Sequence, residues 1–270
     1  MKRLGLIVLH GMGETKRGYA DRFFSWISSR LGAADSTRLV MQQVYYQDIL
    51  QANEEAYFQR VQQHIDWKKL RKFMLYGICD AASLESQKVG QDSPYYIAQQ
   101  RILQAFRDVY RGLEGDDRKL IIVAQSLGGQ VLSNYLWDAS RTSPPPHGVW
   151  SGPLEFASAG EEDFCRGKSI ARLNTTGCNI PIFVAGRNRS DIKPIPRPNS
   201  YFEWHNFYDE DDVLGWPLRA LSDDYAALVK ADHQINSGGL LTGFNPLSHS
   251  NYWDDKDFLR PLLDQIRQHI

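Results

Sequence analysis

One serine in this chain stands where its hydroxyl could act as a nucleophile. Ser126 follows an apolar, mostly β-branched run at residues 120–123 and precedes a segment with apolar residues at helical spacing. A strand, a sharp turn bearing a serine and a helix together predict a nucleophile elbow, in which a strained turn lifts the hydroxyl clear of the sheet edge. Residues two before and two after such a serine must be small, and Ala124 and Gly128 are small. The helix that follows would direct N–H groups and its positive dipole end toward an oxyanion formed at the serine.

The segment around Ser126 resembles the elbow of α/β-hydrolases of the lipase and esterase kind, whose pattern is small-x-Ser-x-Gly. Ala124 stands in place of the commoner first glycine, and Gly129 would let the helix begin close to the strand. The resemblance implies an α/β-hydrolase fold: a mostly parallel central sheet with helices on both faces. It also implies a serine hydrolase in which a histidine removes the serine proton and a carboxylate orients the histidine. The alternative is a strand-to-helix turn with an incidental serine.

The family order of catalytic residues points to an acid near position 212. In α/β-hydrolases the acid and then the histidine follow the serine, each in a loop after a later strand. Strand-like residues 201–208 lead into four carboxylates at positions 209–212. The family usually has a small apolar residue just after the acid, so Asp212, which precedes Val213, is the best match and Asp211 is the second candidate. A calcium loop is the structural rival, but it would need an oxygen ligand where Val213 stands.

His249 is the best candidate for the base, and His233 is its rival. His249 lies in a turn-rich stretch, residues 245–253, before a final helix predicted at 255–266. A histidine on a loop before the last helix is the family arrangement, and Ser-His-x-x-Tyr-Trp resembles lipase-like members. His233 is expected on the way into the last strand, and His205 is expected within a strand.

A loop near the N-terminus completes the predicted site. The apolar run Leu4–Leu9 predicts a strand buried on both faces, as in a parallel sheet. The loop His-Gly-Met-Gly follows at residues 10–13. The resemblance implies that the backbone N–H groups of Met12 and Leu127 form the oxyanion hole. We expect His10 to brace this loop and not to take part in catalysis.

The same stretch partly matches two nucleotide-binding motifs, and each motif lacks a required residue. A dinucleotide-binding fingerprint would need a third glycine where Lys16 stands. Gly13 and Gly18 have the spacing of a P-loop, but Tyr19 and Ala20 replace its Lys-Ser/Thr pair. No metal-ligand spacing is present. The sequence therefore predicts neither a cofactor nor a metal.

Two stretches are loosely constrained by the resemblance. Residues 51–92 read as a helical excursion, which could form one wall of a cap over the site or a surface hairpin without contact to substrate. Residues 143–167, with scattered glycine and proline, predict a long loop that could serve as a lid or substrate entrance. The remaining expected elements are a helix at 19–31, a strand at 39–46, a helix beginning at Ser93-Pro94, and a strand and turn at 173–181.

Composition indicates a soluble globular protein. The 270 residues, 42% hydrophobic and 23% charged, suit one large α/β domain spanning 1–270, or two small ones. The net charge of −1 gives no electrostatic footprint for nucleic acid or an anionic membrane. The odd number of cysteines without a C-x-x-C pair predicts reduced thiols. The apolar run after the first residues is too short for a signal peptide and no run is long enough for a membrane span, so we expect a cytoplasmic location.

These observations predict a serine hydrolase that acts on a small-molecule ester or acyl substrate through an acyl-enzyme. The class of bond is open between carboxylic ester and thioester, and the sequence specifies neither the acyl-chain length nor the oligomeric state. Two other functions remain open. One is a binding protein that keeps the fold without catalysis, and the other is an acyltransferase that uses the same triad with an acceptor other than water.

Overall fold

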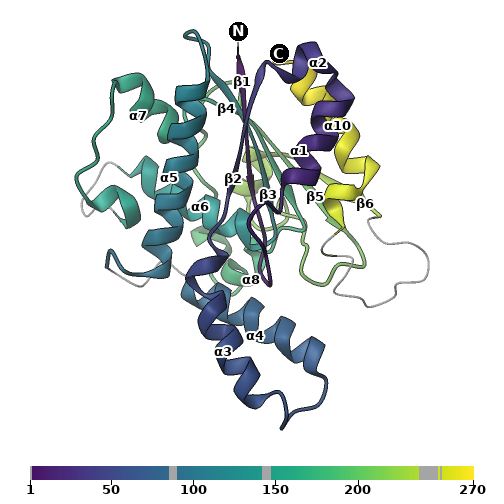
Figure 1. Cartoon of the computed structure of the whole chain (residues 1–270). Coiled ribbons are helices and arrows are strands. Elements are labelled where there is room, and N and C mark those ends of the chain that lie inside the picture. The colour runs from purple at the N-terminus through teal and green to yellow at the C-terminus, as the bar shows by residue number, and fades with distance from the viewer. Residues whose placement is uncertain (1, 85–89, 142–146, 237–248, 250) are drawn as a thin grey trace.

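The protein is a three-layer α/β structure built on a parallel sheet (Figure 1). The computed structural model describes residues 2–84, 90–141, 147–236, 249 and 251–270. Within these residues six strands form one sheet in the order β2-β1-β3-β4-β5-β6, and every neighbouring pair is parallel. The strands are β1 (Leu4–Leu9), β2 (Leu39–Val44), β3 (Lys119–Gln125), β4 (Ile170–Thr176), β5 (Glu203–Asp209) and β6 (Val229–Ile235).

Helices connect the strands and cover both faces of the sheet. The longer ones are α1 (Asp21–Leu31), α3 (Gln51–Val61), α4 (Lys68–Ser83), α5 (Pro94–Gly112), α6 (Leu127–Ser140) and α10 (Lys256–Arg267). The shorter ones are α2 (Ala33–Ser36), α7 (Ala159–Cys165), α8 (Ile180–Val184) and α9 (Asp223–Leu228), with 3₁₀ turns η1 (Gln47–Ile49), η2 (Gly148–Ser151), η3 (Arg189–Asp191) and η5 (Tyr252–Asp254). The predicted α/β class, with a parallel sheet and helices on both faces, is confirmed.

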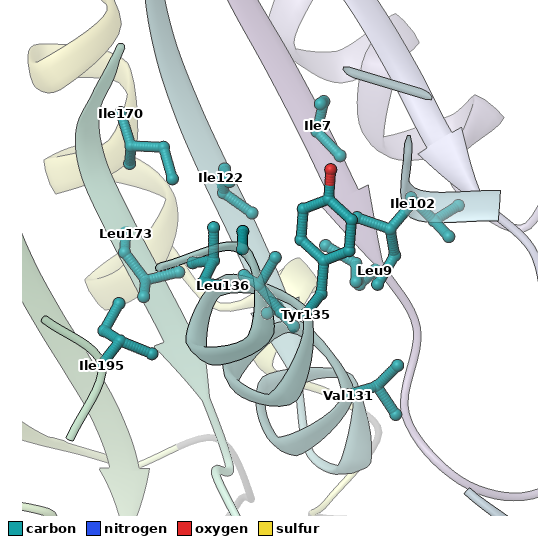
Figure 2. Packing of buried hydrophobic residues seen from close by; sticks show 14 of the residues in the cluster. Ile7, Leu9, Ile102, Ile122, Val131, Tyr135, Leu136, Ile170, Leu173 and Ile195 are labelled. Atoms are coloured by element: carbon teal, nitrogen blue, oxygen red, sulfur yellow. The ribbon is translucent and has the colours of Figure 1, made fainter. Parts of the chain in front are cut away.

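The two faces of the sheet carry separate apolar cores because side chains alternate along each strand. On one face α5 lies over β2 and β1, and α6 lies over β1 and β3. Leu136 of α6 lies beside Ile122 and Leu173, and Tyr135 lies beside Ile102 and Leu9 (Figure 2). The opposite face is covered by α1 and α10. The fully buried residues there include Leu6, Val8, Ile27, Ile121, Val123, Phe258, Leu262 and Ile266.

The order of strands singles out one place on the sheet. The chain moves from β1 to β2 on one side and then returns to β3 on the other side of β1. Where the strand order of an open parallel sheet reverses in this way, the loops at the carboxyl ends of the two central strands run to opposite faces of the sheet. They leave a crevice between them in which ligands bind. The loop at residues 10–13 follows β1, and Ser126 follows β3. Both loops therefore lie at this topological switch point.

Several element boundaries differ from the sequence-based expectation. The strand predicted at 39–46 ends at Val44, because the Tyr46 N–H donates to His10 Nε2 instead of continuing the ladder. The last helix begins at Lys256, capped by the Asp255 side chain.

The stretch at 143–167, predicted to be a long loop, contains helical elements over part of its length. Residues 142–146 lie outside the described residues, but η2 and α7 occupy much of the rest. Val149, Trp150 and Phe164 are buried against the core under α5, so this part of the chain is packed structure.

Figure 1 also places both chain termini at the end of the sheet where β1 begins, opposite the switch point. No helix within the described parts of the chain combines the length and the apolar character that crossing a bilayer requires.

Candidate active site

Ser126 sits in the turn that the elbow motif predicts. Its backbone has φ 51° and ψ −123°, a left-handed φ that a residue with a side chain rarely adopts. The Ser126 N–H donates to the carbonyl of Thr176 on β4, and its own carbonyl accepts from the Gly129 N–H, so the turn is held from both sides. The hydroxyl is buried and has no hydrogen-bond partner among the described residues. An unpaired hydroxyl on a strained turn is free to bond a base or attack a substrate.

The small residues around Ser126 are required by close backbone contacts. A Cβ on Gly128 would lie 2.5 Å from the His10 carbonyl oxygen. A Cβ on Gly11 would lie 2.8 Å from the Ser126 Cβ, and one on Gly129 would lie 3.0 Å from Cys178 Sγ. These glycines let the loop after β1, the start of α6 and the end of β4 pack tightly around the serine.

The backbone strain at position 126 predicts that a glycine there gives a more stable protein than an alanine, the reverse of the order usual in a helix. We expect Ser126→Gly to be more stable than Ser126→Ala by about 0.5–1 kcal/mol, because glycine tolerates the positive φ although its unfolded chain is more flexible. Urea unfolding would measure the difference. At Ser133, inside α6, the order should reverse, since alanine is the better helix former. An Ser126→Ala protein at least as stable as Ser126→Gly would contradict the assigned backbone strain.

Asp212 and His249 form a buried ion-pairing contact near this turn. His249 Nδ1 lies 2.7 Å from Asp212 Oδ2, and both side chains are almost fully buried. Because a carboxylate accepts, Nδ1 carries the proton, and a neutral His249 ring therefore presents the lone pair of Nε2. Nε2 is buried and has no hydrogen-bond partner among the described residues. The side-chain amide of Gln125, next to Ser126, donates to the His249 carbonyl at 2.8 Å and ties the histidine to the elbow.

The charge of Asp212 is maintained inside the protein by several donors. Burial alone would raise its pKa, but the hydrogen bond and charge of His249, the Leu214 N–H and the Tyr252 hydroxyl together hold the pKa of Asp212 below its ordinary value. The carboxylate therefore stays ionised at neutral pH, as an orienting acid must.

Tyr252 and Gly177 are part of this arrangement and were not predicted. The Tyr252 hydroxyl donates to Asp212 Oδ2 at 2.8 Å and accepts from the Asp209 N–H at 2.9 Å. Gly177, with φ 53°, passes so close that a Cβ there would lie 2.8–3.1 Å from Tyr252, Asp212 and His249. The sequence signal for Tyr252 was its place three residues after the candidate base, in the Ser-His-x-x-Tyr-Trp stretch.

Tyr252→Phe should destabilise the protein in a pH-dependent manner. Loss of a hydrogen bond to a buried carboxylate should lower the free energy of unfolding by about 2 kcal/mol. The pKa of Asp212 is depressed in the folded state, so the stability it confers is present above its ordinary value of 3.8 and is lost as pH falls through the lower folded value. The difference between wild type and variant should thus be constant from pH 5 to 8 and shrink below about pH 4.

Urea unfolding at a series of pH values would measure this effect. Tyr57→Phe, on the exposed surface of α3, should leave stability unchanged throughout. A loss in Tyr252→Phe that does not change with pH would argue against the assigned hydrogen bond to the charged carboxylate.

The loop after β1 is rigidly held beside Ser126. His10 is buried; its Nδ1 donates to the Gly11 carbonyl and its Nε2 accepts from the Tyr46 N–H. Burial lowers the pKa of His10 to about 4, so its ring is neutral at physiological pH. His10 therefore braces the loop. Met12 lies in this loop, and Leu127 is the first residue of α6. The two predicted oxyanion donors therefore come from the two segments that flank the switch point.

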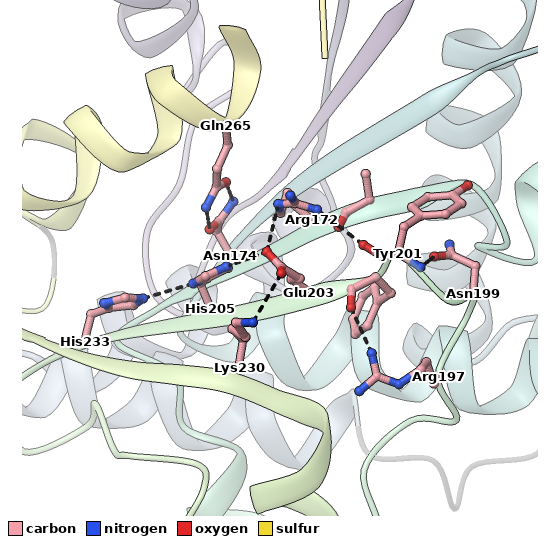
Figure 3. Close-up of polar contacts among 12 residues, drawn as sticks. Arg172, Asn174, Arg197, Asn199, Tyr201, Glu203, His205, Lys230, His233 and Gln265 are labelled. Atoms are coloured by element: carbon pink, nitrogen blue, oxygen red, sulfur yellow. Dashed lines mark hydrogen bonds and ion pairs between the residues drawn. The ribbon is translucent and has the colours of Figure 1, made fainter. Parts of the chain in front are cut away.

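The rival candidates occupy other surroundings. Asp211 is exposed, and its N–H bonds back to Asp209 Oδ1. His233 lies within β6, stacked on Phe207, and its Nε2 is 3.0 Å from Nδ1 of His205 (Figure 3). The two histidines contact each other and the cluster around Glu203, so neither is paired with Asp212.

No group of three or more metal-ligating side chains occurs among the described residues. Comparison of the chain with models of protein families, with curated proteins and with solved structures found no match. The function is therefore inferred from the geometry of the site.

Proposed function

We propose that this protein is a serine hydrolase of the α/β-hydrolase kind that cleaves carboxylic esters or thioesters through an acyl-enzyme. The observation that carries the proposal is the buried Asp212–His249 contact of 2.7 Å, which leaves His249 Nε2 without a hydrogen-bond partner among the described residues. The hydroxyl of the strained Ser126 has none there either, so these two atoms are not hydrogen-bonded to each other, and the elbow is tied to His249 through the Gln125 side chain. A structural histidine in a core normally has both ring nitrogens satisfied. A catalytic base and its nucleophile, in contrast, bond to each other or lie somewhat farther apart when no substrate is bound.

The chemistry follows from these roles. Ser126 Oγ attacks the carbonyl carbon of the substrate while His249 Nε2 takes the hydroxyl proton, and Asp212 stabilises the imidazolium that forms. The N–H groups of Met12 and Leu127 would bind the oxyanion of the tetrahedral intermediate. Collapse expels the alcohol or thiol, which receives the proton from His249. Water, activated by the same histidine, then attacks the acyl-enzyme, releases the acid and restores Ser126.

Labelling by a fluorophosphonate probe tests the proposal directly. The probe phosphonylates an activated serine, so the folded wild-type protein should gain one adduct, and peptide mass analysis should map it to Ser126. Heat-denatured protein is the control for nonspecific reaction. A folded protein that is never labelled, and that hydrolyses no member of a panel of p-nitrophenyl esters and acyl thioesters, would refute the function.

The same panel would define the substrate. A preference along a series of acyl-chain lengths would report the size of the acyl pocket. Product analysis in the presence of alcohols and amines would separate hydrolysis from transfer to another acceptor, because a transferase forms the new ester or amide in preference to the free acid.

A further inference from the structure

The α3–α4 helical hairpin projects from the carboxyl edge of the sheet, where the candidate active site lies (Figure 1). The sequence left two roles open for this segment, a wall of the site or an unconnected surface hairpin. Residues 85–89 lie outside the described residues, but α3 and α4 are described in full. Their contacts connect the hairpin to the loop that carries Met12.

Three consecutive residues of that loop contact one face of α4. The Met12 sulfur lies against Gly77, where an added Cβ would be only 2.7 Å from it. The Gly13 N–H donates to Asp80 Oδ2 at 3.0 Å in a buried hydrogen bond. Eight residues before Asp80, nearer the start of α4, Lys72 lies 3.3 Å from Glu14.

Burying a carboxylate costs free energy, so the buried contact of Asp80 with the loop points to a specific role for this residue. Its side chain is only 1% exposed, and burial raises its pKa. Gln47 donates to both of its oxygens, and the buried Glu54 carboxyl lies beside it. Burial and the neighbouring Asp80 raise the pKa of Glu54 to about 7. The Asp80 carboxyl accepts the Gly13 N–H in this buried surrounding.

The loop is fixed on both sides of Met12. On one side Gly11 lies against Ser126, with no room for a Cβ, and on the other Gly13 is bonded to Asp80. The Met12 N–H lies in the Gly11–Met12 peptide plane, and the Gly13 N–H lies in the next plane, so the two contacts hold the residues on either side of Met12. We propose that Asp80 is a positioning residue that orients the Met12 N–H of the oxyanion hole, and that the α3–α4 hairpin exists in part to supply it. This inference rests on the proposed function.

The test compares Asp80→Ala with Asp80→Asn on a p-nitrophenyl ester that wild type hydrolyses. Asp80→Ala removes the acceptor, and kcat should fall roughly 10- to 100-fold with little change in KM, because a misplaced oxyanion donor weakens binding of the transition state and not of the substrate. Asp80→Asn keeps an acceptor oxygen and should restore kcat to near wild type. If Asp80→Ala does not fold, Asp80→Leu takes its place, since it fills the space without an acceptor.

Tyr76→Phe is the matched control. Its hydroxyl bonds to Glu55 within the same hairpin, so its loss weakens the hairpin without touching the loop. Kinetics should be unaltered in this variant. Equal losses in Asp80→Ala and Tyr76→Phe, a kcat retained in Asp80→Ala, or a loss in Asp80→Asn as large as in Asp80→Ala would each overturn the role of Asp80 while leaving the hydrolase function standing. A wild-type protein without activity or labelling would instead remove both.

Discussion

Replacement of Ser126 by alanine is expected to lower kcat toward an ester substrate by about 10⁴- to 10⁶-fold, which is the effect of losing a triad nucleophile in a serine hydrolase. The hydroxyl is buried and unpaired among the described residues, so its removal breaks no hydrogen bond within that part of the fold. The alanine protein should therefore fold normally and bind substrate, yet neither turn it over nor react with a fluorophosphonate.

Steady-state kinetics on the best p-nitrophenyl ester would measure this loss. Ser133→Ala, in the helix that follows, is the matched control and should keep full activity. If Ser126→Ala retained labelling and turnover, the nucleophile would be another residue, and the assignment of the elbow would fall.

Asp212→Asn is expected to cost about 10³- to 10⁴-fold in kcat while preserving the shape of the site. An asparagine amide can donate to His249 Nδ1, which then accepts and leaves the ring proton on Nε2. In that tautomer His249 cannot take the proton of Ser126. The loss should appear in kcat at every pH at which the enzyme is folded.

Asp211→Asn provides the comparison one residue away. Asp211 is exposed and contacts the turn only through its backbone N–H, so its variant should keep wild-type kinetics. The opposite result, a crippled Asp211→Asn and an active Asp212→Asn, would move the acid to Asp211 and would require a different pairing for His249.

Local patterns carried most of what the sequence could predict. The turn at Ser126 was predictable because its causes lie within five residues: a buried strand before it, and Ala124 and Gly128 two positions away on either side. The alternation of short apolar strands with helices likewise predicts a parallel α/β sheet. Asp212 and His249 were selected by their order after Ser126, and the structure brings their side chains together.

The features that the sequence did not predict depend on contacts between residues far apart in the chain, or on helices too short to show a hydrophobic periodicity. The Tyr252 hydroxyl reaches Asp212 and the Asp209 N–H across about forty residues, and the Gly13–Asp80 bond spans 67 positions. No pattern near either residue indicates its partner. The seven-residue helix α7 is too short for a hydrophobic stripe, although Ser158 and Glu161 have capping-box spacing, which could have revealed its start.

The termini lie at the end of the sheet opposite the carboxyl end of β3, which Ser126 follows and where Gln125 is bonded to His249. A bead, a purification handle or a fluorescent protein joined to either terminus would therefore stand on the far side of the molecule from the reacting groups. The protein should keep its catalytic rate when tethered in this way, so it lends itself to immobilised assays and to fusion without redesign of the site.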